Sequence, residues 1–185
     1  MKIQINNLTK KYGDKVVFEN YTSTFDFDDI LIIKGSSGLG KTTLIRMIAG
    51  LEKADYGEIT TPVSKISFMF QEDRLIPFVS VLKNLTAVCS EEKALYYLKL
   101  MGLDEEKDNS PLALSGGMRR RVSLARALCF DSELVILDEP FKGLDEDLKV
   151  NICKIIKSEA KNRAFIIISH DIEDAQLLNA KIIEL

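Results

Sequence analysis

Gly35-Ser36-Ser37-Gly38-Leu39-Gly40-Lys41-Thr42 is the stretch that decides how the rest of the chain is interpreted. It satisfies the phosphate-loop pattern, in which a glycine-rich turn ends in Gly-Lys-Thr. An apolar run, Ile30 to Ile33, precedes the loop, and an amphipathic helical segment follows it. Strand, loop and helix in this order predict a site where backbone N–H groups and the positive end of the helix bind phosphate.

The side chains of this loop predict a nucleoside triphosphate with Mg²⁺. Lys41 offers a mobile charge to the β and γ phosphates, and the Thr42 hydroxyl suits Mg²⁺, which prefers oxygen ligands. A glycine-rich turn with an incidental Lys is the alternative, and the strand before and helix after disfavour it. The residues expected to bind nucleotide here are Gly35, Ser36, Ser37, Gly38, Leu39, Gly40, Lys41, Thr42 and Thr43.

A second apolar run, Leu134 to Leu137, ends abruptly in Asp138 and Glu139. Two carboxylates at the tip of a buried strand are costly unless they meet a cation or a reacting water. Because side chains alternate along a strand, the two cannot share one task. We expect Asp138 to contact Mg²⁺ and Glu139 to act as general base. An ordinary acidic turn is the less favoured interpretation.

Leu114-Ser115-Gly116-Gly117-Met118 leads into a predicted helix, Arg119 to Leu128. A Ser hydroxyl, two glycines and a helix dipole form a second potential anion-binding surface. A capped helix with a flexible approach is the simpler alternative. Without this stretch, a phosphate loop and an acidic strand end would also suit nucleotide kinases, helicases and GTPases.

With the stretch Leu114 to Met118 included, the chain resembles the ABC ATPase family from Tyr12 to His170, and its motifs occur in the family's order. The resemblance implies that the ligand is ATP with Mg²⁺. It also implies that two cassettes pair head to tail, so that Ser115, Gly116 and Gly117 of each close over the ATP of the other.

The resemblance assigns roles to four further residues. Tyr12 matches the aromatic residue that stacks on adenine, and Gln71 matches the glutamine that touches Mg²⁺ or the attacking water. Asp145, in the loop that begins at Gly143, matches a residue at the dimer interface. His170 matches the histidine near the γ phosphate. Taken alone, Tyr12 would more often be a packing residue and His170 a structural one.

The expected fold is α/β, a P-loop NTPase with a mostly parallel central sheet and flanking helices. An N-terminal antiparallel β layer and a small helical subdomain, about 72–114 with Ser80 and Ser90 as N-caps, complete a single domain, 1–185. The expected antiparallel strands are Lys2 to Leu8, Lys15 to Phe18 and Tyr21 to Phe27; the parallel ones are Ile30 to Ile33, Ile66 to Met69, Leu134 to Leu137 and Phe165 to Ile168.

Charged residues and cysteines add little to the functional interpretation. A helix after Asp145 is expected to place Lys149 away from its apolar face, and Arg119 to Arg121 are interpreted as a solvated or interface patch. A net charge of -3 argues against nucleic acid as a partner. The cysteines, Cys89, Cys129 and Cys153, are expected to be reduced packing residues.

The resemblance implies an ATP-hydrolysing subunit of a membrane transporter, working through separate permease subunits and, in the full system, a solute-binding protein. No apolar run reaches the roughly 20 residues of a membrane span, and the N-terminus lacks the apolar block of a secretion signal, so we expect a cytoplasmic chain on the inner face of the membrane. The stretch Gln71 to Pro77 and Met118 resemble the nitrate, sulfonate and taurine importers, although Phe78 stands where they have Trp.

Two alternatives to a transport ATPase remain. One is an ABC ATPase of DNA maintenance or of the ribosome. The short interval between Lys41 and Ser115 leaves no room for the long coiled coil of the former, and the chain has one cassette where the latter usually have two. The other is a catalytically silent cassette, which the complete set of catalytic residues disfavours.

Overall fold

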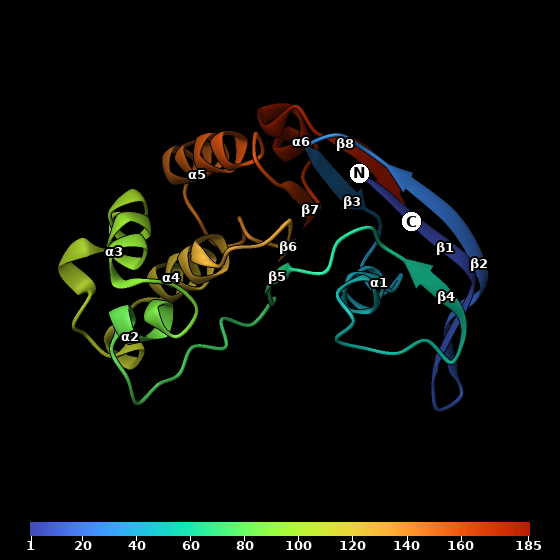
Figure 1. The fold of residues 1–185 in the computed structure, drawn as a ribbon, viewed down its shortest axis with the longest axis horizontal. Coiled ribbons are helices and arrows are strands. Elements are labelled where there is room, and N and C mark those ends of the chain that lie inside the picture. Colours follow the sequence, from blue (N-terminus) through green and yellow to red (C-terminus); the bar gives the residue numbers. More distant parts are fainter.

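A five-stranded parallel sheet lies at the centre of the computed structural model, which describes residues 1–185 (Figure 1). Its strand order is β5-β6-β7-β3-β8. The bounds are β3 (Ile30–Lys34), β5 (Ile66–Met69), β6 (Leu134–Asp138), β7 (Ala164–Ile168) and β8 (Lys181–Glu184). The four predicted parallel strands are confirmed. The edge strand β8 was not predicted, because its four residues are half-buried at most and carry no continuous apolar signal.

A three-stranded antiparallel sheet, β2-β1-β4, forms the predicted N-terminal layer. Its strands are β1 (Lys2–Tyr12), β2 (Lys15–Asp26) and β4 (Tyr56–Thr60). Ending β1 at Leu8 and dividing β2 in two were wrong predictions. Asn7 and Asn20 have φ of 49° and 50°, a left-handed conformation that asparagine tolerates, so the strands bulge there and then continue. The Thr22 hydroxyl accepts the Asn7 N–H, and the Thr9 hydroxyl accepts the Asn20 N–H.

Six α-helices connect or cover the strands. They are α1 (Lys41–Ile48), α2 (Val81–Thr86), α3 (Glu91–Leu100), α4 (Gly116–Cys129), α5 (Glu146–Glu159) and α6 (Ile172–Leu178), with 3₁₀ turns at Asp104–Glu106 and Pro111–Ala113. The N-caps predicted before α2 and α3 are confirmed: the Ser80 hydroxyl accepts from the Lys83 N–H at 3.2 Å, and that of Ser90 from the Lys93 N–H at 3.4 Å. None of the helices combines the length and apolar character that a bilayer crossing requires.

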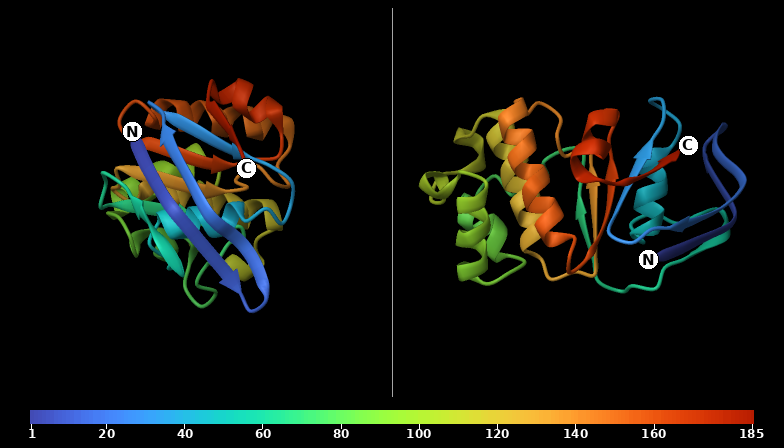
Figure 2. Two further views of the ribbon diagram at one scale, coloured as in Figure 1. Left: turned by 90° about the vertical axis from the view of Figure 1, so that its right-hand side faces the viewer. Right: turned by 90° about the horizontal axis from the view of Figure 1, so that it is seen from above.

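Two hydrophobic cores lie on opposite faces of the parallel sheet, and the strands alternate between them. Leu31, Ile33, Ile136 and Ile166 pack with α1 and with the antiparallel sheet, so α1 is enclosed between two sheets. The residues that alternate with these along each strand, such as Ile32, pack with the helices on the opposite face of the parallel sheet. Figure 2 shows α1 on one side of the sheet and α5 on the other. Strands buried on both faces explain their uninterrupted apolar sequences.

Helices α2, α3 and α4 pack together at the end of the molecule opposite the antiparallel sheet (Figures 1 and 2). Leu85, Tyr97, Leu98 and Leu128 are buried where these helices meet. The subdomain boundary at about 72–114 stays a prediction. Cys129 and Cys153 are buried, Cys89 is half-buried and all three are free thiols, so the prediction of reduced packing residues is confirmed.

Candidate active site

The carboxyl ends of four parallel strands bring the predicted site residues together. Strand β3 runs into the phosphate loop, β6 into Glu139, β7 into His170 and β5 into Gln71. Since β3 pairs with β7, β7 with β6 and β6 with β5, all in parallel, these four ends lie at one edge of the sheet. Ligand sites of open α/β sheets form at this edge.

The phosphate loop packs closely against the antiparallel sheet. Gly40 has φ of 88°, and a Cβ there would lie 2.4 Å from Val17 Cγ1, so only glycine fits. The Lys41 ammonium donates to the carbonyls of Gly35 and Ser36, each at 2.8 Å. Burial lowers the pKa of Lys41, and the nearby carboxylates of Glu139 and Asp138 oppose that shift. The loop thus holds a buried ammonium beside the acidic strand end.

A cavity of about 340 Å³ opens between this loop and the strand ends. Its lining contains many of the predicted residues: Tyr12, Ser37, Gly38, Gly40, Lys41, Thr42, Thr43, Gln71, Glu139 and His170. Lys15 and Val17 also line it and were not predicted, because nothing in a strand sequence shows that its side chains face a distant loop. Gly35, Ser36 and Leu39 line a separate hollow beside the end of β8. The chain therefore forms a cavity in which the phosphate loop lies beside the Tyr12 ring.

Asp138 is fully buried at the end of β6. Its Oδ2 accepts the Thr42 hydroxyl at 3.0 Å, whereas its Oδ1 is buried without a hydrogen-bond partner. Burial raises the pKa of Asp138; the Thr42 hydrogen bond opposes this, and the charge of Glu139 adds to it. A buried carboxylate oxygen without a partner, next to a hydroxyl, fits a hard cation such as Mg²⁺.

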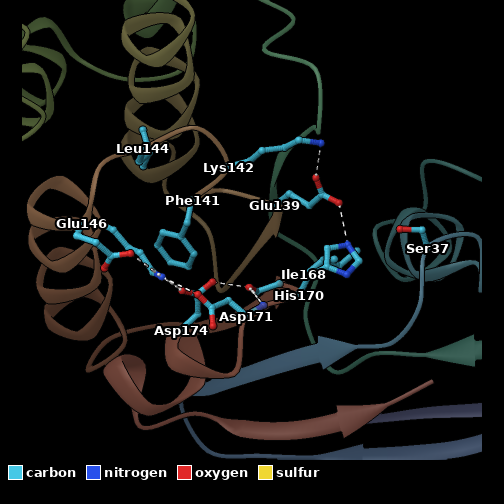
Figure 3. Close-up of a pocket in the computed structure, with 12 residues that line it drawn as sticks. Ser37, Glu139, Phe141, Lys142, Leu144, Glu146, Ile168, His170, Asp171 and Asp174 are labelled. Atoms are coloured by element: carbon cyan, nitrogen blue, oxygen red, sulfur yellow. Dashed lines mark hydrogen bonds and ion pairs between the residues drawn. The ribbon is translucent and has the colours of Figure 1, made fainter.

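Glu139 has φ of 52°, an unfavourable conformation for a residue with a Cβ. Its carboxylate contacts Lys142 Nζ and His170 Nε2, each at 3.1 Å (Figure 3), and accepts from Gln71 Nε2, also at 3.1 Å. Burial acts to raise the pKa of Glu139, but the hydrogen bonds from Lys142, His170 and Gln71 outweigh it, so the pKa lies below its usual range. At neutral pH this carboxylate is ionised and held by three side chains.

The second predicted anion-binding surface does not line the cavity of its own chain. Ser115 caps α4, its hydroxyl accepting the Met118 N–H at 3.3 Å. A Cβ on Gly117 would lie 3.8 Å from the Gly143 carbonyl, so this helix start borders the loop that leads to Asp145. Asp145 caps α5 through the Leu148 N–H at 2.9 Å. These residues form a surface apart from the phosphate loop.

Of the two interpretations of Arg119, Arg120 and Arg121, the solvated face is wrong for Arg120, which is buried, and the interface patch stays a prediction. All three guanidinium groups donate to backbone carbonyls. Arg119 donates to Leu114, just before the helix, and Arg121 donates to Met101, both at 2.6 Å. Arg120 donates to four carbonyls. Charge patterning cannot reveal this, because a long side chain reaches carbonyls that only the fold places nearby.

The expectation that Lys149 lies away from the packed face of its helix was also wrong. Lys149 is buried, with its ammonium 2.9 Å from Asp171 and from Asp174 and 3.7 Å from Glu146. Figure 3 shows these three carboxylates near one another. Ser169, which precedes His170, donates to Asp174 and accepts the Asp171 N–H at 3.1 Å. This cluster fixes the turn that carries His170 and lines a second cavity of about 390 Å³ that reaches Glu139.

Comparison with known proteins decides the family. The ABC transporter family model matches residues 18–142. The chain belongs to the ABC transporter family. It is 34% identical, over 99% of its length and 80% of the relative's, to the aliphatic sulfonates import ATP-binding protein SsuB of a Bacillus cereus strain. The predicted family is confirmed, and the DNA-maintenance and ribosomal alternatives are not favoured.

Solved structures give the same result for this ABC cassette. The dimeric structure of a bacterial ABC transporter cassette superposes with a TM-score of 0.89 at 27% identity, covering 99% of this chain and 94% of the other. A dimeric post-hydrolysis state of the same cassette, bound to ADP and Pi, gives 0.88 at 26% identity with the same coverage. The predicted P-loop NTPase fold is confirmed, and the chain is an ATP-binding subunit of the ABC class.

Proposed function

We propose that this ABC cassette hydrolyses ATP at the cavity between the phosphate loop and β6 to drive import of a solute through separate membrane subunits. The observation that carries the proposal is the carboxylate of Glu139, held by Gln71 and His170 at the rim of a cavity that Lys41 also lines. An ionised carboxylate facing the phosphate cradle is the arrangement that a general base for water requires.

Each residue has a role that its position allows. The loop N–H groups and Lys41 bind the β and γ phosphates, and the exposed ring face of Tyr12 stacks on adenine. Glu139 orients the attacking water and accepts its proton, while His170 and Gln71 keep the carboxylate in place. Thr42 and Asp138 would hold Mg²⁺, with Gln71 in reach. When bound, Mg²⁺ neutralises phosphate charge.

A second cassette completes the site in this proposal. Ser115, Gly116 and Gly117 do not line their own chain's cavity, although they offer a capped helix start of the type that binds phosphate. The dimeric structures of similar cassettes support a partner of the same kind. In the proposed pair, each helix start and the loop at Asp145 lie across the interface from the ATP of the other copy.

Permease subunits are the proposed membrane partners, with a solute-binding protein in the full system. The similar Bacillus cereus protein is an import ATP-binding protein. Phe78 is 91% exposed and Leu112 72% exposed, and a 2.9 Å hydrogen bond from Ser110 to the Pro77 carbonyl ties their segments together. We take these two exposed apolar side chains as the candidate contact with the permease. We place the cassette on the cytoplasmic face of the membrane through this contact.

Two substitutions test the proposal. Glu139→Gln keeps the size of the side chain but removes its basicity, so we expect ATP turnover to fall by about a hundredfold or more while ATP-dependent pairing strengthens. Lys41→Ala removes the ammonium and should abolish nucleotide binding. Steady-state hydrolysis, equilibrium binding of ATP and light scattering with ATP measure the three effects. Unchanged turnover in Glu139→Gln contradicts the assignment of the base, and unchanged affinity in Lys41→Ala contradicts the phosphate site.

A further inference from the structure

We propose that Arg120 is a positioning residue that joins helix α4 to the two strand ends carrying Gln71 and Glu139. This inference rests on the proposed hydrolytic function and adds a residue that acts through others and touches no substrate. Its consequence is mechanical: a shift of α4 at its N-terminal end moves the catalytic carboxylate of the same chain.

The Arg120 side chain is 7% exposed and binds four backbone carbonyls. One terminal nitrogen donates to Phe70 at 3.0 Å and to Gln71 at 2.7 Å. The other donates to Asp138 and to Glu139, each at 2.6 Å. A single guanidinium therefore bridges the end of β5 and the end of β6. Its remaining charge partner is Asp73, 3.6 Å away.

The chemistry of this bridge is specific to arginine. Carbonyls at strand ends lie where the pairing of the sheet stops, and buried carbonyls need donors. A guanidinium has five N–H groups in a rigid planar fork and stays charged, whereas an ammonium is a point with three donors. A lysine in place of Arg120 would thus be unable to hold both pairs of carbonyls at once. Burial lowers the pKa of Arg120, and Asp73 opposes that shift.

The bridge ends on a residue with an unfavourable backbone conformation. The left-handed conformation of Glu139, with φ of 52°, persists only where surrounding contacts impose it. The contacts that do so are the Arg120 bond to its carbonyl, a bond to the same carbonyl from the Lys142 N–H at 3.3 Å, and the bond from its N–H to the Ile168 carbonyl at 3.1 Å. Losing the first would let the backbone relax and re-aim the carboxylate.

Arg126, on the same helix, holds the next part of the β5 loop. It donates to the carbonyls of Asp73 at 3.2 Å and Arg74 at 3.0 Å. The loop that carries Gln71 is therefore attached to α4 at two places, about one and a half turns apart. Only Arg120 also reaches β6. Helix α4 and this loop would move together, and Arg120 transmits that movement to Glu139.

Helix α4 also begins at the surface proposed to bind the partner's ATP. Ser115 caps it, and Arg120 lies in its second turn. Binding of the partner's nucleotide at the helix start would thus bias the position of Glu139 in the chain that provides the helix. The Arg120 guanidinium would thus couple the two sites of a pair, because nucleotide bound at either site would influence its position.

The test compares Arg120→Lys with Arg121→Lys in the full chain. Arg121 is adjacent on α4 and also donates to carbonyls, those of Met101 and Gly102, but touches no strand end. For Arg120→Lys we expect kcat to fall about a hundredfold, as a misplacement of roughly 1 Å can produce, with ATP affinity within about twofold. Arg121→Lys should change neither quantity by more than about twofold.

Amide hydrogen exchange by mass spectrometry supplies a readout that does not need turnover. In Arg120→Lys, peptides covering 70–74 and 138–144 should exchange faster than in the parent protein, and in Arg121→Lys they should not. Unchanged exchange in those peptides, or equal losses of kcat in the two variants, overturns the inference. If the parent protein itself does not hydrolyse ATP, the proposed function fails, and the exchange of the two segments still decides the role of Arg120. Thermal unfolding of both variants identifies any general loss of the fold, in which case Arg120→Gln replaces Arg120→Lys.

Discussion

At the scale of single residues, two neighbouring carboxylates show how position sets chemistry. Asp138 and Glu139 are adjacent in sequence, yet burial raises the pKa of the first while hydrogen bonds lower the pKa of the second. Asp138 is the last residue of the buried strand β6, whereas Glu139 follows the strand in a left-handed conformation and its carboxylate lines the cavity. Separate tasks for the two were predicted from the alternation of side chains along a strand.

The raised pKa of Asp138 leads to a prediction about stability without nucleotide. A carboxyl group whose pKa is higher in the folded state than in the unfolded state destabilises the fold at neutral pH, because its charged form is penalised by burial. Asp138→Asn removes that charge and keeps an acceptor for Thr42. We expect the ligand-free variant to melt higher by about 2–4 °C, corresponding to roughly 1 kcal/mol.

The same variant should lose its response to metal. Differential scanning fluorimetry with ATP alone and with ATP plus Mg²⁺ measures it: the extra stabilisation that Mg²⁺ gives the parent protein should disappear in Asp138→Asn. Asp131→Asn, which removes the same charge from an exposed position before β6, serves as the control. A full Mg²⁺ response in Asp138→Asn would place the metal elsewhere.

Residues differ in how far the sequence alone predicts them. Lys41, Thr42, Asp138 and Glu139 were predicted because loop, strand and charge form one local pattern that has a chemical reason. Arg120 was misinterpreted because its partners lie about 50 and about 20 positions away, and no pattern of charge encodes those carbonyls. Local chemistry can be read from a sequence, whereas contacts made by long side chains depend on the finished fold.

At the scale of elements, the apolar parallel strands were the easiest to predict and the short, mostly exposed strands β4 and β8 the hardest. Strand β7 is buried throughout and reads as a continuous apolar run, whereas β4 and β8 are exposed at most positions and do not. Helix α5 was predicted from its apolar spacing, but Lys149 was placed wrongly. Periodicity gives the packed face of a helix and cannot show which charge at its margin has acidic partners.

The Lys149 cluster gives the prediction at this scale. Lys149→Met keeps the bulk of the side chain but leaves Asp174, 3% exposed, without its cation. Removing one partner of a buried ion pair costs about 3–5 kcal/mol. We therefore expect the melting temperature to fall by roughly 6–20 °C, at about 2–4 °C per kcal/mol for a domain of this size. Lys154→Met, at an exposed position of the same helix, should change it little.

The pH dependence of this cluster has a defined sign. The pKa of Asp171 is lowered by its hydrogen bond with Lys149, so its stabilising contribution is present above the unfolded value of about 3.9 and is lost as pH falls through the folded pKa. The pKa of Lys149 is raised by Asp171 and Asp174, so its contribution is lost only as pH rises beyond about 10.4. Urea unfolding at pH 7 and at about pH 3, below the unfolded pKa of an aspartate, should show the difference between parent and Lys149→Met shrinking toward the acid end. A difference that is constant with pH would contradict the ionic origin of the effect.

At the scale of the whole molecule, one chain carries two different parts of the proposed ATP site, and these parts do not meet within the chain. The phosphate loop and strand ends line one cavity, and the helix start at Ser115, which we propose binds the partner's ATP, does not line it. In a two-fold symmetric pair, each surface of one copy meets the other surface of its partner. The proposed function therefore requires that every complete site draws on two chains.

Mixing two inactive variants tests that requirement. Lys41→Ala has a defective phosphate loop and an intact helix start, whereas Ser115→Arg places a bulky cation at the helix start and leaves the phosphate loop intact. Neither homodimer has a complete site. In a hybrid, the loop of the Ser115→Arg chain faces the helix start of the Lys41→Ala chain, so one site of the two is whole. Random pairing makes about half of the dimers hybrids, and turnover should recover to about a quarter of the parent rate if that site works alone.

The control combines both substitutions in one chain and mixes that chain with Lys41→Ala. Every phosphate loop in this second mixture is defective, so no pairing of its chains yields a complete site and turnover should stay at the level of the separate variants. Differently tagged chains and affinity capture measure how many hybrids each mixture contains. If the first mixture contains hybrids and gains no more turnover than the second, no site draws on two chains. Recovery in the first mixture alone is the result that a shared site requires, because neither of its chains can supply both surfaces by itself.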